Sequence, residues 1–417
     1  MTQLRELLRI RDYRYLWTAQ VISDFGDSLT SLTLLILIQR ITGSTVALAG
    51  LLISITLPAL LIGTVAGVYV DRFDRKRLMI ISDVARAAIV LLFLFARTEE
   101  LVPVIYALAF AQSAVGTLFR PARGAFLPAV VGEEKLLAAN SVSQTSMVLF
   151  NVLGTTAAGL IAAVSETLGA AFVLDSITFL VSALLVSRIA TPGMPEKGAE
   201  GKVWAELKTG VMVMLRSRHL RGVIISVSVL MLGLGAVNVL MVPFLLGDLG
   251  VSEAFFGAIE ASQVAGMVIS GTVVAILAAR LKPSSLISLG LLGIGVTVGI
   301  IGGITVVWQL MIVLFLVGLS VGPAQAGMST LSQTLVKDSM RGRVGGVLNA
   351  LISAATVVSM GLAGGLAAAI GTRNVFLLAG VLAVVASILV FVFFRGLSVE
   401  EQRGAAPLAA APSEASA

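Results

Sequence analysis

The sequence predicts an all-α membrane protein whose twelve transmembrane helices form two pseudo-symmetric six-helix bundles. Of its 417 residues, 57% are hydrophobic and only 12% are charged, and the mean hydropathy is +1.01. A soluble domain carries about 25% charged residues, so this chain has too few polar groups to cover a surface that faces water. The apolar runs are long and unbroken, whereas a β-barrel alternates polar and apolar residues, and the spans are therefore predicted to be helices.

Twelve runs of about twenty apolar residues mark the expected spans. The first six lie near 15–39, 45–70, 78–97, 101–122, 138–164 and 170–190, and the second six near 221–247, 254–280, 284–304, 308–335, 345–370 and 373–395. Four parts follow from this pattern: a bundle over 1–190, a cytoplasmic linker with an amphipathic helix over 191–218, a second bundle over 219–395, and a disordered tail over 396–417.

The two halves resemble each other weakly. Pro121 in FRPARGAF of the fourth span corresponds to Pro323 in VGPAQAGM of the tenth, and AAGLIAA in the fifth span corresponds to AGGLAAA in the eleventh. Internal symmetry of this kind is typical of secondary transporters, which bind substrate between their halves near the middle of the bilayer.

Basic residues gather on one set of loops and predict the orientation. The expected inner loops carry Arg5, Arg9, Arg11, Arg14, Arg72, Arg75, Lys76, Arg77, Lys135, Arg280, Lys282, Lys337, Arg341, Arg343 and Arg403, whereas the opposite loops carry only Arg40, Arg97 and Arg373. The positive-inside rule places both termini and the linker in the cytoplasm of a protein of the inner (plasma) membrane. The same rule accounts for the net charge of +6, so we expect no nucleic-acid partner.

Residue usage disfavours most enzyme chemistry. The chain has no cysteine and a single histidine, His219, which argues against zinc sites and against catalysis by a Ser-His or Cys-His pair. No glycine-rich phosphate loop follows a strand. We expect a monomer without a cofactor or a resident metal, and a membrane-embedded enzyme remains only a remote alternative.

The stretch GVYVDRFDRKR, residues 67–77, holds two acids and four bases between the second and third spans. Asp71 ends the second span, and the positive start of the eleventh span near Gly345 would favour its carboxylate. The loop arginines could pair with acids such as Asp74 and Asp83. We predict a cytoplasmic gate that forms in one conformation and breaks in the other, built from Gly67, Asp71, Arg72, Arg75, Lys76, Arg77, Asp83, Arg86, Arg120 and Arg123.

The same stretch resembles a known family pattern. GVYVDRFDRKRLM is similar to the loop of the major facilitator superfamily, which reads Gly, three residues, Asp-Arg, two residues, Arg-Lys-Arg; Asp74 stands where that pattern usually has Gly. DYRYLWTAQVISDFGDSL in the first span, SDVAR in the third, and PARGAFLPAVVGEEKLLAANS between the fourth and fifth resemble the drug-efflux branch that includes macrolide and siderophore exporters.

The resemblance covers nearly residues 1–400 and implies the major facilitator fold. It also implies a central cavity lined by the first, fourth, seventh and tenth helices, alternating access, and, for most efflux members, exchange of substrate for protons. Related antiporters often carry a Gly-Pro pair in the fifth helix, where this chain has Gly154-Thr155-Thr156. That departure weakens the antiporter prediction.

Two acids lie deep in the first span. At 1.5 Å per residue, Asp24 and Asp27 stand roughly 12 and 16 Å into a core of about 30 Å. A charge at that depth costs several kcal/mol and suggests a function, and residues three apart share one helix face. We predict proton coupling or cation binding by Asp27, Asp24 and Glu260, the last roughly 10 Å from the outer face in the eighth span. The alternative is that these acids are structural hydrogen-bond partners between helices.

Further polar residues lie within the spans. We predict that the substrate cavity includes Gln112, Asn238, Gln263 and Gln325, with interhelical hydrogen bonding as the alternative. Asp175 lies near the start of the sixth span, where an acid favours the helix dipole, and we interpret it as structural.

Taken together, these features predict a proton-coupled exporter of amphipathic small molecules or drugs. The acids of the first span favour neutral or cationic substrates, and deep arginines for an anion are few. The alternatives are an exporter or flippase of a lipid, a siderophore or a metal cation. Without cysteine or a deep histidine, such a cation would have to be one that prefers oxygen ligands.

Overall fold

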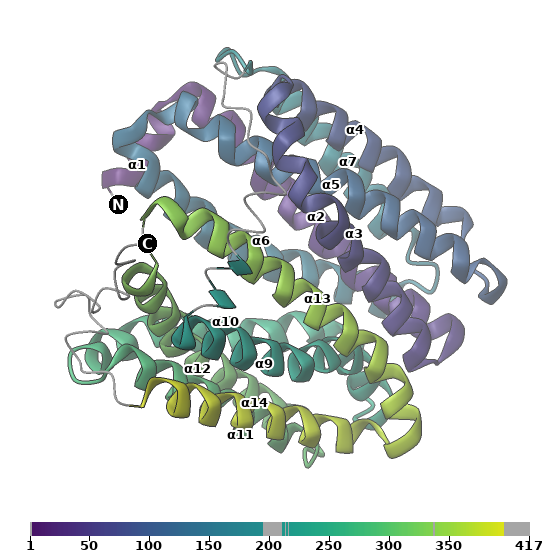
Figure 1. Ribbon diagram of the computed structural model, residues 1–417. Helices are drawn as coiled ribbons and strands as arrows, with labels where there is room; N and C mark the ends of the chain where they lie inside the picture. The colour runs from purple at the N-terminus through teal and green to yellow at the C-terminus, as the bar shows by residue number, and fades with distance from the viewer. Residues whose placement is uncertain (1, 195–210, 213, 216, 337, 396–417) are drawn as a thin grey trace, which may run out of the picture. The chain divides into compact units, whose positions relative to one another are not determined.

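The computed structural model describes residues 2–194, 211–212, 214–215, 217–336 and 338–395. In that part of the chain the regular elements are all helices, and twelve of them are long and apolar enough to cross a membrane (Figure 1). The predicted fold class is therefore confirmed. Most of the expected linker helix and the whole expected tail fall outside the described residues.

The membrane helices follow the expected order with small shifts at their ends. A short helix, α1 (Thr2–Arg9), precedes the first six, which are α2 (Arg11–Thr42), α3 (Thr45–Arg72), α4 (Arg75–Leu92), α5 (Val102–Val131), α6 (Leu136–Val164) and α7 (Gly169–Ser187). The second six are α9 (Arg218–Pro243), α10 (Phe256–Ala278), α11 (Pro283–Ile301), α12 (Val307–Leu335), α13 (Asp338–Ile370) and α14 (Thr372–Phe394).

Helix α5 differs most from the expectation. The sequence analysis ends this span at residue 122, but the helix continues to Val131 with Pro121 and Pro128 inside it. A proline inside a helix removes one backbone hydrogen bond, and membrane helices tolerate this loss because neighbouring groups satisfy the freed carbonyl. As a consequence, Arg120 and Arg123 lie within a continuous helix and not at its end.

The chain divides into two compact units. The first joins the N-terminal helices α1–α7 with Val239–Ala261 and Ala363–Gly365, and the second holds most of the remaining C-terminal half. Within the first unit, close packing brings the short helix η5 (Glu253–Phe255) onto α6. A Cβ atom on Gly159 would overlap the carbonyl oxygen of Glu253, so only a glycine permits this approach.

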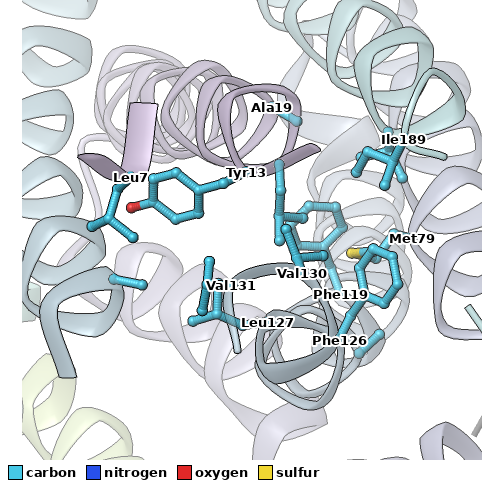
Figure 2. Close-up of a cluster of buried hydrophobic side chains, with 14 of the residues drawn as sticks. Leu7, Tyr13, Ala19, Met79, Phe119, Phe126, Leu127, Val130, Val131 and Ile189 are labelled. Carbon is cyan, nitrogen blue, oxygen red and sulfur yellow. The ribbon is translucent and has the colours of Figure 1, made fainter. Parts of the chain in front are cut away.

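A cluster of buried side chains, the hydrophobic cluster, closes the end of the first unit where the basic loop 72–77 lies. It joins Leu7 of α1, Tyr13 of α2, Met79 of α4, and Phe119 and Phe126 of α5 (Figure 2). Leu7 and Tyr13 are each 1% exposed. Because α1, α2, α4 and α5 all contribute to it, this cluster fixes where α2 begins relative to α5.

The basic loop is held by hydrogen bonds to the segment that follows α7. Asp74 is the N-cap of α4, and its carboxylate accepts a hydrogen bond of 3.0 Å from the backbone N–H of Arg77. The Nζ of Lys76 donates to the carbonyl of Ile189 at 2.6 Å, and the N–H of Arg75 donates to the carbonyl of Gly193 at 2.9 Å. Asp74 therefore has a local structural role. The side chain of Asp71 and the surroundings of Gly67 lie outside what the structure describes.

We expect Asp74→Ala to destabilise the protein by about 1 kcal/mol, because α4 would lose its N-cap. Asp74→Asn keeps an oxygen that accepts the same backbone hydrogen bond, and it should stay close to the parent. Thermal unfolding of both variants in detergent checks this prediction. An equal effect of the two substitutions would show that the charge of Asp74, and not its capping, is what stabilises the loop.

Candidate functional site

The two deep acids of α2 face one cavity in the first unit. The cavity has a volume of about 580 Å³ and is lined by residues of α2 to α6. Its charged lining consists of Asp24 and Asp27 from α2, Arg86 from α4, and Arg120 and Arg123 from α5. The cavity also contains Gln112, which the sequence analysis assigned to the substrate cavity.

Asp27 forms an ion pair with Arg86. The Nη1 atom of Arg86 lies 3.2 Å from Oδ1 and 3.1 Å from Oδ2 of Asp27, so one nitrogen is shared by both carboxylate oxygens. The side chain of Asp27 is 40% exposed, whereas that of Arg86 is 4% exposed. The carboxylate in this ion pair is therefore accessible from the cavity, whereas the guanidinium is almost inaccessible.

Arg86 is held by a second acid on its own helix. Its Nη2 atom donates to Oδ1 of Asp83 at 2.5 Å, which is the expected pair three residues apart. Asp83 is fully buried, and the hydroxyl of Ser182 on α7 donates to its other oxygen at 2.6 Å. Arg86 thus lies between two carboxylates, one buried and one facing the cavity. Within the described contacts, Asp83 pairs with Arg86 and not with the loop arginines.

Two aromatic rings complete the surroundings of Arg86. Its guanidinium carbon lies 4.2 Å from the ring centre of Phe179 on α7 and 5.2 Å from that of Phe119 on α5. A buried ion loses several kcal/mol of hydration, which only well-placed partners offset. The two carboxylates supply the counter-charge, and the aromatic faces add cation–π attraction.

Asp175 lies beside this group and was not expected there. It stands nearly two turns inside α7, so the helix start does not explain its position. Its Oδ2 accepts a hydrogen bond of 2.5 Å from Thr30, and its Oδ1 accepts one of 3.0 Å from Thr178. A Cβ atom on Gly26 would overlap Oδ1 of Asp175 and the hydroxyl of Thr178. The glycine directly before Asp27 therefore permits the close contact of α2 with α7.

Gln20 connects Asp24 to Arg123 of α5. Its Nε2 donates to Oδ2 of Asp24 at 3.1 Å, and its Oε1 accepts a hydrogen bond from Arg123. The sequence analysis missed this glutamine. Its spacing of four residues from Asp24 could have indicated the contact, because residues four apart are neighbours on a helix.

The other predicted site residues are not among the residues that line this cavity. Glu260 of α10 belongs to the first unit, where its carboxylate accepts a hydrogen bond from Thr155 of α6. The second unit contains the remaining three, Asn238 of α9, Gln263 of α10 and Gln325 of α12. The structure brings Asp83 and Arg86 together with Asp27, and it places Arg120 and Arg123 in the cavity wall. Their roles in a gate stay predictions.

Arg40 at the end of α2 makes contacts that no local pattern signals. Its Nη2 atom lies 2.8 Å from Oε1 of Glu253, which is 213 residues away, and 2.7 Å from the carbonyl oxygen of Ala162. Its Nη1 atom donates to the carbonyl of Ser165 at 3.1 Å. A cation suits the C-terminal end of a helix, and here Arg40 caps α6 while binding Glu253. All four residues belong to the first unit.

Twelve membrane helices and a charged cavity among the first six describe a membrane transport protein. The sequence profile of the Major Facilitator Superfamily matches residues 16–234 and 223–416, and the chain belongs to this family of transporters. The family resemblance expected from the sequence is therefore confirmed, and so is the expectation that the protein is a transporter and not an enzyme.

Named relatives and solved structures agree with this assignment. Macrolide efflux protein A of Streptococcus pyogenes is 25% identical over 88% of this chain and 92% of its own length. Enterobactin exporter EntS of Shigella boydii is 27% identical over 85% of each chain. The crystal structure of the nucleoside transporter NupG superposes with a TM-score of 0.74 at 11% identity, over 91% of this chain and 99% of that one, and thus supports the fold.

We expect Arg86→Met to destabilise the protein by about 3–5 kcal/mol, because Asp83 would stay buried without its cation. Asp27→Asn should destabilise the protein less than Arg86→Met does, because the carboxylate of Asp27 is partly exposed. Denaturant unfolding in mixed micelles would compare the two variants with the parent. A double variant, Asp83→Asn with Arg86→Met, should recover part of the lost stability, and no recovery would contradict the assignment of the penalty to Asp83.

Proposed function

We propose that this protein is a proton-coupled exporter of amphipathic small molecules, with both termini on the cytoplasmic side of the inner (plasma) membrane. The observation that carries this proposal is the ion pair between Asp27, which faces the cavity, and Arg86, which is buried. The two relatives named for macrolide efflux and enterobactin export support the direction of transport. Alternating exposure of the substrate site by the two six-helix bundles is part of the proposal.

In the proposed mechanism, Asp27 exchanges a proton for substrate. A proton that enters from the cavity and binds Asp27 removes the negative charge that attracts Arg86. Arg86 does not need to move in response, because Asp83 still pairs with it. Protonation therefore breaks a contact between α2 and α4 while the buried part of the charge network stays intact.

The coupling to conformation follows from this contact. A ligand shifts an equilibrium between two conformations only if it binds them with different affinity. The ion pair stabilises the conformation in which Asp27 and Arg86 are in contact, and the proton weakens that conformation by neutralising Asp27. A substrate that occupies the cavity next to Asp27 would compete with the proton. Binding of one would thus favour release of the other, as exchange requires.

Asp24 and Glu260 complete the proposed set of coupling acids. Asp24 lines the same cavity as Asp27, one helical turn away, and is 8% exposed. Its carboxylate accepts a hydrogen bond from Gln20, so a proton on Asp24 would also alter the contact between Gln20 and Arg123. Glu260 accepts a hydrogen bond from Thr155, which stands in α6 where related antiporters often have a proline. We assign Asp27 the principal role, because it alone of the three acids has a direct ion pair among the described contacts.

We expect Asp27→Asn to abolish gradient-driven uptake into inverted membrane vesicles. Asparagine cannot bind or release a proton at this site, so uptake of a lipophilic cationic dye and of a macrolide should fall to the level of vesicles without the protein. The matched control is Glu133→Gln, which neutralises an exposed acid in the loop before α6 and should transport like the parent.

A second measurement on the same vesicles separates coupling from binding. With no proton gradient, preloaded unlabelled substrate should still exchange for labelled substrate in Asp27→Asn, because exchange requires the cavity but not the proton. If Asp27→Asn accumulates substrate as the parent does, Asp27 is not the coupling residue. If the parent transports these probes but its uptake does not respond to the gradient, proton coupling itself is wrong.

A further inference from the structure

The wall of the cavity formed by α5 carries two positive charges, of which the proposed coupling involves only Arg123, through its contact with Gln20. Arg120 and Arg123 are three residues apart and therefore share one face of the helix. Arg120 is exposed, and among the described contacts its guanidinium makes no hydrogen bond and no close ion pair. Arg123 is half-buried, and its partner is the neutral side-chain oxygen of Gln20. Neither guanidinium is thus in direct contact with a carboxylate.

Charge is distributed unevenly along the cavity. On the α4 side, one guanidinium, that of Arg86, is shared by the carboxylates of Asp27 and Asp83, and Asp175 lies beside them, so acidic groups outnumber the single guanidinium. On the α5 side, the guanidiniums of Arg120 and Arg123 stand against the single carboxylate of Asp24, which leaves one excess positive charge. The cavity therefore has a negative side and a positive side, and the positive side has a guanidinium available to a ligand.

The remaining lining is mixed, with serine, threonine and glutamine side chains beside an apolar portion. Leu34 of α2, Ile55 and Ala59 of α3, and Met147 of α6 offer a surface for a hydrophobic body. Arg120 is exposed in the cavity wall and has no direct contact with a carboxylate among the described contacts, so its guanidinium is accessible to a ligand. A guanidinium presents a planar set of donors that fits a carboxylate or a phosphate with two parallel hydrogen bonds.

We propose that the cavity binds amphipathic molecules that carry an anionic head group, a carboxylate or a phosphate, and that Arg120 and Arg123 hold this group. This inference rests on the proposed function for its physiological meaning, but binding can be measured without a proton gradient. It differs from the expectation that the acids of α2 favour neutral or cationic substrates. The sequence analysis placed both arginines at the end of a span, whereas the continuous helix α5 places them in the cavity wall.

The test uses two probes that differ only in the acidic group. Rhodamine B carries a free carboxylate, and its ethyl ester has the same ring system without that charge. We expect the purified protein in detergent to bind rhodamine B more tightly than the ester, measured by fluorescence anisotropy. Arg120→Gln should reduce this preference by about tenfold or more, which is the order expected for one lost charge-assisted hydrogen bond. Arg120→Lys should keep part of the preference.

The control is Arg188→Gln, which removes an exposed arginine at the end of α7, outside the cavity lining, and should leave both affinities unchanged. Equal binding of the two probes by the parent, or no binding of rhodamine B, would overturn the proposal. So would an Arg120→Gln variant that binds rhodamine B as the parent does. A role for Arg120 in a gate predicts a different result, in which transport of both probes falls equally while their relative affinity is unchanged.

Competition identifies the source of the anionic group. If phosphatidylglycerol displaces rhodamine B and phosphatidylcholine does not, the head group of an anionic lipid is bound. If neither lipid competes and rhodamine B still depends on Arg120, the ligand is a soluble amphiphile. These binding measurements need no gradient. They can therefore support or contradict the anion-binding proposal even if proton coupling fails in vesicles.

Discussion

The charged cavity depends on the ion pairs that the buried guanidinium of Arg86 forms with Asp27 and Asp83. Removing an arginine from water is costly, and here the cost is offset by Asp83 on the same helix, by Asp27 on α2 and by two aromatic rings. The ring of Phe179 and the hydroxyl of Ser182, which binds Asp83, both come from α7. One side chain thus sets the relative positions of α2, α4 and α7, and it holds the carboxylate of Asp27 at the cavity surface.

Small residues make this arrangement possible, because α2 is in close contact with helices on two sides. Gly26 lets the side chain of Asp175 approach α2 from α7, and Gly154 lets α6 approach the backbone at Phe25. Helix α2 has little freedom to shift within the first unit when it is packed so closely. Protonation of Asp27 therefore acts on its side chain and on its contact with Arg86, and a conformational response has to involve the packed helices together.

The separation of charge across the cavity connects the coupling proposal with the proposal on substrate. The negative side contains the acid that is proposed to take up a proton, and the positive side contains the arginines that are proposed to bind an anionic head group. Gln20 lies between the two, because it contacts both Asp24 and Arg123. An anion that draws Arg123 away from Gln20 would also change the hydrogen bond that Asp24 receives. The substrate and the coupling acids would then influence each other through a single glutamine.

The sequence by itself determined the membrane class, the twelve helices, the family and the shared face of Asp24 and Asp27. These properties depend on composition, on span length and on the spacing of residues within one helix, all of which are local. The pair of Asp83 with Arg86 was predictable for the same reason, since its members are three residues apart.

Only the tertiary structure decided which charges meet between helices. Arg86 is 59 residues from Asp27, and Arg40 is 213 residues from Glu253, so no pattern along the chain connects them. The place of Arg120 and Arg123 depended on whether α5 continues through Pro121, and a proline is as compatible with the end of a helix as with its interior in a membrane. Hydropathy tells which segments enter the bilayer, but the rotation and packing of the helices determine which side chains face one another.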